Sequence, residues 1–221
     1  MEINSPVKKV FLLCLLSSII VFGQCQVKMV QLSHYLFPEF EKGIVLMKSG
    51  DQKVALLNYN ELTSEMIFDN NGTKLAFSQT ELVDTIYIQD RKFVLLDKKF
   101  VELIYKSKCE LFADYKCSIV DPGKPSGYGG TSQTAATTTF SSFYTSGQVY
   151  NMKLPEGTET KSSVEYWLRI DGNLNKFVSL RQMYQSFPDK KELIKNYRKT
   201  HNPDYDNLGS IIEMIKFLEK N

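Results

Sequence analysis

Short apolar runs alternate with turn residues between Gly43 and Val120. The runs read GIVLMK, KVALLNY, EMIFD, TKLAF, VDTIYI, KFVLL, FVELIY and CELFADYKCSIV. Runs of this length and spacing are typical of short β-strands, and Asn71–Gly72 is the clearest hairpin signal among the turns. Because no gap is long enough for a crossover helix, the strands should pair antiparallel. The pattern predicts a meander of about eight strands, forming an open sheet or a barrel-like roll.

A second hairpin and a helical segment are predicted toward the C-terminus. QVYNMKL reads as a strand, and VEYWLRI and LNKFV then flank the turn residues Asp171–Gly172. Apolar residues next recur at helical spacing in three stretches: Leu180, Met183, Tyr184 and Phe187; Leu193, Ile194, Tyr197 and His201; and Leu208, Ile211, Ile212, Ile215 and Leu218. Pro188 should end the first helix, and Asp189 with Glu192 has the spacing of a capping box for the second. The expected fold class is therefore α+β, an antiparallel meander followed by a hairpin and about three helices.

Composition divides the chain into four parts. Residues 1–23 have the pattern of a signal peptide, residues 24–121 form the β-rich region, residues 122–147 are rich in Gly, Ser and Thr, and residues 148–221 hold the hairpin and the helices. The third part can bury too little apolar surface to offset its own chain entropy. We therefore expect it to be a surface loop or linker.

The N-terminal segment predicts export. Lys8 and Lys9 precede the apolar run VFLLCLLSSIIVF, and the small residue Gly23 follows it, which is the three-part pattern of a secretory signal. As a helix this run would be about 20 Å long, too short for a hydrocarbon core of about 30 Å. We expect cleavage after Gly23 and a periplasmic or secreted protein.

Cysteine placement bears on both anchoring and redox state. Lipidation of Cys25 would make the protein a membrane-associated lipoprotein, although the preceding residues FGQ depart from the usual lipobox. Cys109 and Cys117 fall on the apolar face of one predicted strand, where their spacing would separate them by about 26 Å. A disulfide needs Cα atoms within roughly 7 Å. We expect two buried free thiols.

The charge balance argues against a nucleic-acid partner. The formal net charge is +2, and such a balance offers no electrostatic footprint for a polyanion of that kind. We expect a protein or envelope component as the partner, no nucleic acid and no cofactor.

The GYGG turn and the hydroxyl residues after it form the first candidate ligand site. Its residues are Gly127, Tyr128, Gly129, Gly130, Thr131 and Ser132. Backbone N–H groups of a glycine-rich turn can make a nest for an anion. The stretch lacks the Lys and the helix start of a phosphate loop, so an ordinary surface loop is the alternative.

The segment NPDYDNLGSIIE is the second candidate site, for calcium. Its possible ligands, spaced roughly as in an EF-hand loop, are Asn202, Asp204, Asp206, Ser210 and Glu213. However, Asn207 stands where such loops require glycine. The alternative needs no metal, because Asn202–Pro203 can end one helix and Asp206 or Asn207 can cap the next.

Catalytic motifs are not apparent in the sequence. The chain has no GxSxG, no HExxH and no dinucleotide fingerprint, and its only histidines are His34 and His201. We expect a non-enzymatic binding or structural module. The alternative is a hydrolase acting on envelope glycan or peptide through acidic residues near Asp84 and Asp90, or at the GYGG turn.

Four stretches together resemble a known family. They are LLNYNELTSEMIF, VDTIYIQDRKFV, PGKPSGYGGTSQTAA and FPDKKELIKNYRK. In this order they are similar to exported proteins of Bacteroidota, over nearly the whole chain after residue 23. The resemblance implies an envelope or secreted location and a β-rich body with C-terminal helices. No activity is attached to that family, so the resemblance assigns no catalytic residue.

Overall fold

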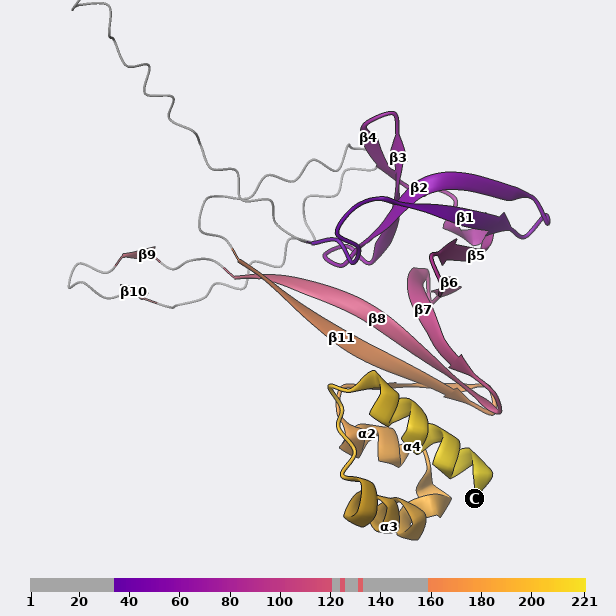
Figure 1. The fold of residues 1–221 in the computed structure, drawn as a ribbon, viewed down its shortest axis with the longest axis vertical. Helices are drawn as coiled ribbons and strands as arrows, with labels where there is room; N and C mark the ends of the chain where they lie inside the picture. Colours follow the sequence, from indigo (N-terminus) through magenta and orange to yellow (C-terminus); the bar gives the residue numbers. More distant parts are fainter. Residues whose placement is uncertain (1–33, 121–123, 126–130, 133–158) are drawn as a thin grey trace, which may run out of the picture.

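One antiparallel sheet of ten strands runs through the protein and carries three α-helices at one end (Figure 1). The structure is a computed structural model that describes residues 34–120, 124–125, 131–132 and 159–221. The strands of this sheet are β1 (Glu41–Met47), β2 (Gln52–Asn60), β3 (Glu65–Asn70), β4 (Thr73–Ala76), β5 (Val83–Ile88), β6 (Arg91–Leu96), β7 (Lys99–Lys106), β8 (Cys109–Val120), β11 (Glu159–Ile170) and β12 (Asn173–Phe177). The α+β class predicted from the sequence is confirmed.

The strand order shows how the sheet is assembled. It reads β12-β11-β8-β7-β6-β5-β1-β2-β3-β4, so β1–β4 and β5–β8 are two meanders joined where β5 pairs with β1. From the edge strand β4 the chain returns through the short 3-10 helix η1 (Thr80–Leu82). The alternation of apolar and polar residues along β5 is compatible with pairing to β4 or to β1. It therefore does not predict that β5 pairs with β1.

Two tight turns occur where the sequence places them. Asn71 and Gly72 have φ of 53° and 89°, and Asp171 and Gly172 have φ of 48° and 81°. Positive φ at both central residues defines the type I′ turn, whose twist matches that of the flanking strands. The β3–β4 and β11–β12 hairpins are therefore held in register by their turns.

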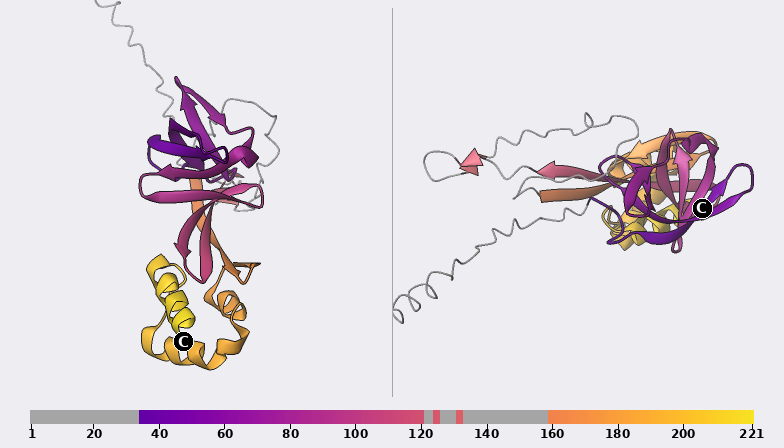
Figure 2. Two further views of the ribbon diagram at one scale, coloured as in Figure 1. Left: turned by 90° about the vertical axis from the view of Figure 1, so that its right-hand side faces the viewer. Right: turned by 90° about the horizontal axis from the view of Figure 1, so that it is seen from above.

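The buried side chains form two main cores. One core fills the curl of β1–β7 and contains Leu57, Tyr59, Phe93 and Phe100. The other joins β8, β11 and β12 to the helices. Tyr115 of β8 packs against both cores. The long pair β8 and β11 thus links the curled strands to the helical segment, which lies at the opposite end of the molecule from β4 in both Figure 1 and Figure 2.

The helices are α2 (Leu180–Gln185), α3 (Lys191–His201) and α4 (Leu208–Lys220). α2 and α4 each begin after a residue whose side chain caps the helix. The Ser179 side chain accepts from the Gln182 N–H, and the Asn207 side chain accepts from the Ser210 N–H. This confirms Asn207 as the cap of α4, one of the two alternatives that the sequence offered.

Two details of α3 differ from expectation. Residues Pro188–Lys190 form the 3-10 helix η3, which runs directly into α3, and no side chain caps α3. The predicted capping box is therefore wrong, because Asp189 lies inside a helical turn instead of in the extended conformation that a cap needs. His201 was expected on the inward stripe but is exposed, with its ring stacked on Tyr197 at a centroid distance of 4.1 Å.

Candidate functional site

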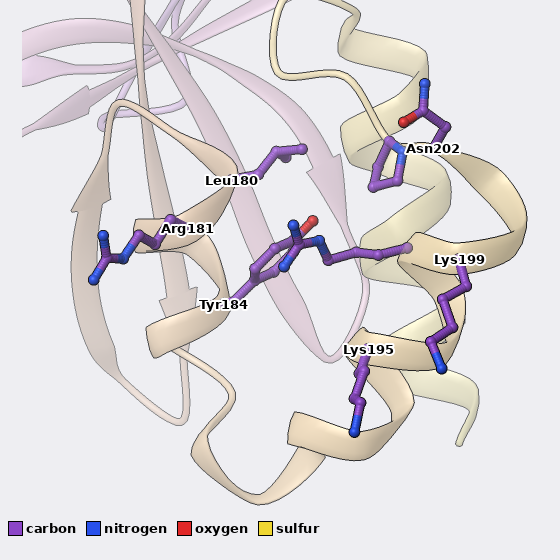
Figure 3. Close-up of a pocket in the computed structure, with 8 residues that line it drawn as sticks. Leu180, Arg181, Tyr184, Lys195, Lys199 and Asn202 are labelled. Carbon is purple, nitrogen blue, oxygen red and sulfur yellow. The ribbon is translucent and has the colours of Figure 1, made fainter.

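A groove between α2 and α3 is an open hollow in the described part of the chain. Its larger hollow, of about 590 Å³, is lined by Leu180, Arg181, Tyr184, Lys195, Arg198, Lys199, Asn202 and Pro203 (Figure 3). A second hollow of about 380 Å³ is lined by Tyr184, Gln185, Pro188, Lys191 and Ile194. Tyr184 lines both hollows, so we treat them as two halves of one site and name it the α2–α3 groove.

Helical spacing explains why these residues share one groove. On α3, Lys191, Lys195, Arg198 and Asn202 are separated by four, three and four positions, which places them on one face. The neighbouring face, with Ile194 and Tyr197, is buried in the core. The helix therefore contributes its apolar stripe to the fold and leaves a basic stripe beside α2.

The larger hollow has a one-sided charge. Four of its lining residues are basic and none is acidic. Figure 3 shows the Tyr184 ring between the two helices and Lys195 and Lys199 extending from α3, while the Arg181 guanidinium points away from α3 on the other side of α2. The guanidinium of Arg198 lies over the Tyr184 ring, 5.7 Å from its centroid, which is within the range of a cation–π contact.

Tyr184 supplies a buried hydroxyl at the centre of the groove. Its oxygen is shielded from solvent and has no hydrogen-bond partner among the described residues. Burial raises the pKa of Tyr184, and the charge of Arg198 lowers it by less. The phenol therefore stays protonated at neutral pH.

Two features partly oppose the positive charge of the groove. Lys195 lies 3.7 Å from Glu192, but both side chains are more than half exposed, so the pair screens little. The groove also reaches the C-terminus of α3, where a helix carries partial negative charge. There the Thr200 hydroxyl is within hydrogen-bonding distance of the Asn196 and Tyr197 carbonyls and can cover one of them. The four basic side chains dominate the local field.

The candidate calcium residues lie in the connection between α3 and α4 and in the first two turns of α4. Asn202 ends α3 in the left-handed conformation with φ of 43°. The Asp204 carboxylate accepts from the Asp206 N–H at 3.0 Å, and the Asp204 N–H donates to the Ser210 hydroxyl at 3.0 Å. These contacts build two capped helices from the residues that the sequence suggested as ligands.

Glu213, the last candidate calcium ligand, is exposed in the second turn of α4. Within the described residues, no three His, Cys, Asp or Glu side chains converge as a metal site requires. The calcium site stays a prediction. The structure shows the same segment ending α3 and capping α4.

The glycine-rich candidate site falls largely outside the described residues. Gly127, Tyr128, Gly129 and Gly130 lie there, as does the strand predicted for QVYNMKL. Thr131–Ser132 form β10, which pairs with β9 (Lys124–Pro125) in a small two-stranded sheet. The anion nest at this turn also stays a prediction.

The carboxylates that the fold buries are not those singled out from the sequence. Asp84 is exposed and accepts from the Thr85 hydroxyl, and Asp90 is exposed in the β5–β6 turn. The acidic side chains buried in the sheet are instead Glu61, Glu102 and Asp114. Their positions were not recognisable in advance, because burial of a charged side chain depends on which strands meet.

Each of these interior carboxylates has a partner. Arg91 donates to both oxygens of Glu102, and the Lys116 ammonium lies 2.9 Å from Asp114. The hydroxyl of Ser162 donates to Glu61 at 2.7 Å. The first of these contacts joins β6 to β7 and the third joins the residue after β2 to β11, whereas Asp114 and Lys116 both lie on β8. All three are structural.

Cys109, Cys117 and His34 are further side chains with reactive groups. Cys109 and Cys117 are free, as predicted. Cys109 is buried, and burial raises the pKa of its thiol to about 12, assisted by Glu219, so it is a poor nucleophile. Cys117 was expected to be buried but is half-exposed, because it lies on β8 beyond the helical core. His34 is buried, and its carbonyl accepts from the Glu61 N–H.

Comparison with protein-family models, with curated proteins and with solved structures found no match. Among the described residues, no helix combines the length and the hydropathy needed to cross a membrane. The account of function therefore depends on the geometry of the chain itself.

Proposed function

We propose that the protein is an exported binding module that takes an anionic ligand of the cell envelope in the α2–α3 groove. The observation that carries the proposal is the larger hollow, with its four basic side chains, no acidic one, and the buried hydroxyl of Tyr184. A concave site with a few converging polar groups and an aromatic wall is typical of ligand binding.

The ion pairs elsewhere in the described structure support this proposal. Where Arg91 and Lys116 are partly buried, each is matched by a carboxylate. In the described structure, by contrast, Arg181, Arg198 and Lys199 of the groove form no ion pair. Basic side chains without acidic partners around one hollow raise the local concentration of anions.

Export enters the proposal from the sequence. The basic residues, apolar run and Gly23 of the N-terminal segment favour a periplasmic or secreted location, and the resemblance to exported proteins of Bacteroidota agrees with it. The hydrolase alternative is less well supported, because the acidic side chains that the fold buries are engaged with Arg91, Lys116 and Ser162.

A thermal-shift series tests the binding claim. A ligand that binds only the folded state raises the melting midpoint in proportion to ln(1 + [L]/Kd). We expect phosphate or sulfate to raise the midpoint relative to chloride at equal ionic strength. The gain should disappear in the double variant Arg181→Gln/Arg198→Gln. The matched control Lys216→Gln/Lys220→Gln removes two charges from α4 and should keep it.

Three outcomes would overturn the binding claim: no anion-dependent gain, a gain that survives loss of both arginines, or a gain that the α4 control also loses. Export is tested separately by fractionation of cells that produce the full chain, followed by sequencing of the N-terminus. Recovery from the periplasm or medium with residues 1–23 removed supports the proposed location. An intact N-terminus on a cytoplasmic protein contradicts it.

A further inference from the structure

The two halves of the α2–α3 groove differ in chemistry. The larger half carries Arg181, Lys195, Arg198 and Lys199. The smaller half is lined by Pro188, Ile194 and the ring of Tyr184, with Gln185 and Lys191 at its polar positions. A ligand that fills both halves must therefore have a charged part and an apolar part joined at Tyr184.

The cationic half fits a group with more than one negative charge. Two guanidinium groups and two ammonium groups line it. Guanidinium presents paired N–H donors that match phosphate and carboxylate geometry. A phosphate monoester carries about −1.5 to −2 charge near pH 7 and three acceptor oxygens, whereas a carboxylate carries one charge. The phosphate monoester therefore uses more of the donors present.

The smaller half fits a ring or a short apolar group. Its volume is about 380 Å³, which lies at the low end of the range for small-molecule sites. The Tyr184 side chain forms the wall between the halves, so a ring in the smaller half would lie against an aromatic face.

From these observations we infer that the ligand of the α2–α3 groove is an organic phosphate, a phosphate monoester bonded to a ring or a short apolar group. The inference rests on the proposed function, since it names the class of anion that the groove binds. The phosphate lies in the larger half beside Arg198, and the organic part lies in the smaller half, against Tyr184 and Ile194.

Isothermal titration of the mature chain with four probes tests this. The probes are phenyl phosphate, inorganic phosphate, benzoate and phenol. We expect phenyl phosphate to bind about tenfold more tightly than inorganic phosphate, the gain that one aromatic contact provides. Benzoate should bind more weakly than phenyl phosphate, and phenol should give no measurable binding.

Variants assign the two parts of the ligand. Arg198→Gln should weaken both phosphates, and Lys216→Gln on α4 should weaken neither. Tyr184→Leu should remove the advantage of phenyl phosphate over inorganic phosphate. If Tyr184→Leu fails to fold, as judged by circular dichroism, Tyr184→Phe replaces it. That variant keeps the ring and removes only the hydroxyl, which solvent does not reach, so it should retain the advantage of the phenyl group, and loss of that advantage would contradict the contact with the ring.

The outcomes separate this inference from the proposed function. Equal affinity for benzoate and phenyl phosphate, or for inorganic and phenyl phosphate, overturns the organic-phosphate inference and leaves the anion site standing. Absence of binding by any anion overturns both. Vesicles containing phosphatidic acid present the same group on a lipid. If the protein sediments with these vesicles and Arg198→Gln abolishes the sedimentation, the ligand is an organic phosphate carried by a lipid. If the protein binds phenyl phosphate but does not sediment with the vesicles, the ligand is a soluble organic phosphate.

Discussion

The guanidinium of Arg91 on β6 donates to both carboxylate oxygens of Glu102 on β7, over 3.0 Å and 2.6 Å. The hydroxyl of Tyr115 on β8 donates to the same carboxylate at 2.6 Å. Because Tyr115 packs against both cores, this contact joins three neighbouring strands at the point where the curled strands meet the helical segment. Aromatic rings also surround the Arg91 guanidinium, which lies 4.9 Å from the centroid of the Tyr115 ring.

Replacing Arg91 with Leu should strongly destabilise the protein. Glu102 would keep its charge in a site where its side chain is 9% exposed, and breaking a buried pair by removing one partner costs about 3 kcal/mol or more. Chemical denaturation at pH 7 measures the loss. The control is Glu192→Gln, which breaks the exposed pair with Lys195 and should change stability by less than about 0.5 kcal/mol. Equal effects of the two variants would refute the role assigned to Arg91.

Glu219 fastens α4 to the β7–β8 hairpin. Its carboxylate accepts from the Cys109 N–H at 2.8 Å and from the Tyr105 hydroxyl at 2.7 Å. Although burial by itself raises the pKa of Glu219, these hydrogen bonds outweigh it and leave the pKa lowered. Glu219→Gln should therefore cost about 1.5 kcal/mol at pH 7, the value of hydrogen bonds to a charged group.

The pH dependence checks the sign of that effect. A carboxylate with a lowered folded-state pKa contributes stability above its unfolded pKa of about 4.3 and loses it as the pH falls through the folded value. The difference between wild type and Glu219→Gln should shrink between pH 5 and pH 3 in denaturation series. A difference that stays constant over this range would mean that the charge of Glu219 is not involved.

Glu61 should behave in the opposite way. Burial raises its pKa, while the hydrogen bond from Ser162 and the charge of Arg91 lower it by less. With a raised folded-state pKa, the contribution to stability is present below the unfolded pKa and is lost as the pH rises. Glu61→Gln keeps an acceptor for Ser162 and removes the charge.

We therefore expect Glu61→Gln to be more stable than wild type at pH 7. A typical point mutation instead lowers the free energy of unfolding by about 1 kcal/mol. The gain should fade toward pH 4, where wild-type Glu61 takes up a proton. Denaturant midpoints at both pH values measure it. A loss of stability at pH 7 would show that the ionised carboxylate is needed.

Gly43 is required where β1 passes between β2 and β5. A Cβ at this position would lie 2.6 Å from the Tyr87 carbonyl oxygen and 2.7 Å from the Leu57 side chain, and the backbone oxygen cannot move away freely. Gly43→Ala should cost about 2 kcal/mol through overpacking. Lys42→Ala, at the exposed neighbouring position, should be nearly neutral in the same melting experiment. Similar midpoints for the two variants would contradict this packing.

The periodicity of the sequence predicted most elements but not their neighbours. Alternation located β1–β8, and Asp171–Gly172 located the turn after β11, because each depends on residues close in the chain. The pairing of β1 with β5 depends on which edges meet, and local alternation carries no information about that. The η3 turn before α3 was missed for a related reason, since Asp189 and Glu192 have the right spacing but not the backbone conformation of a cap.

The candidate sites show the same limit. The net charge argued against a nucleic-acid partner and the anion site was predicted at the GYGG turn, whereas the basic hollow is lined by Arg181 of α2 and Arg198 of α3. Their helical spacing was visible in the sequence, whereas the packing of α2 beside α3 was not. Likewise Glu61 and Glu102 looked like ordinary surface residues, and only the folded sheet buries them.

The most direct measurement is a map of backbone amide shifts in the ¹⁵N-labelled mature chain during titration with phosphate. The account predicts that the largest shifts fall on residues of the α2–α3 groove, above all Tyr184, Arg198 and Lys199, and that Arg181→Gln/Arg198→Gln abolishes them. Shifts concentrated on β1–β7, or unchanged in that double variant, would contradict the claim that this groove is the binding site.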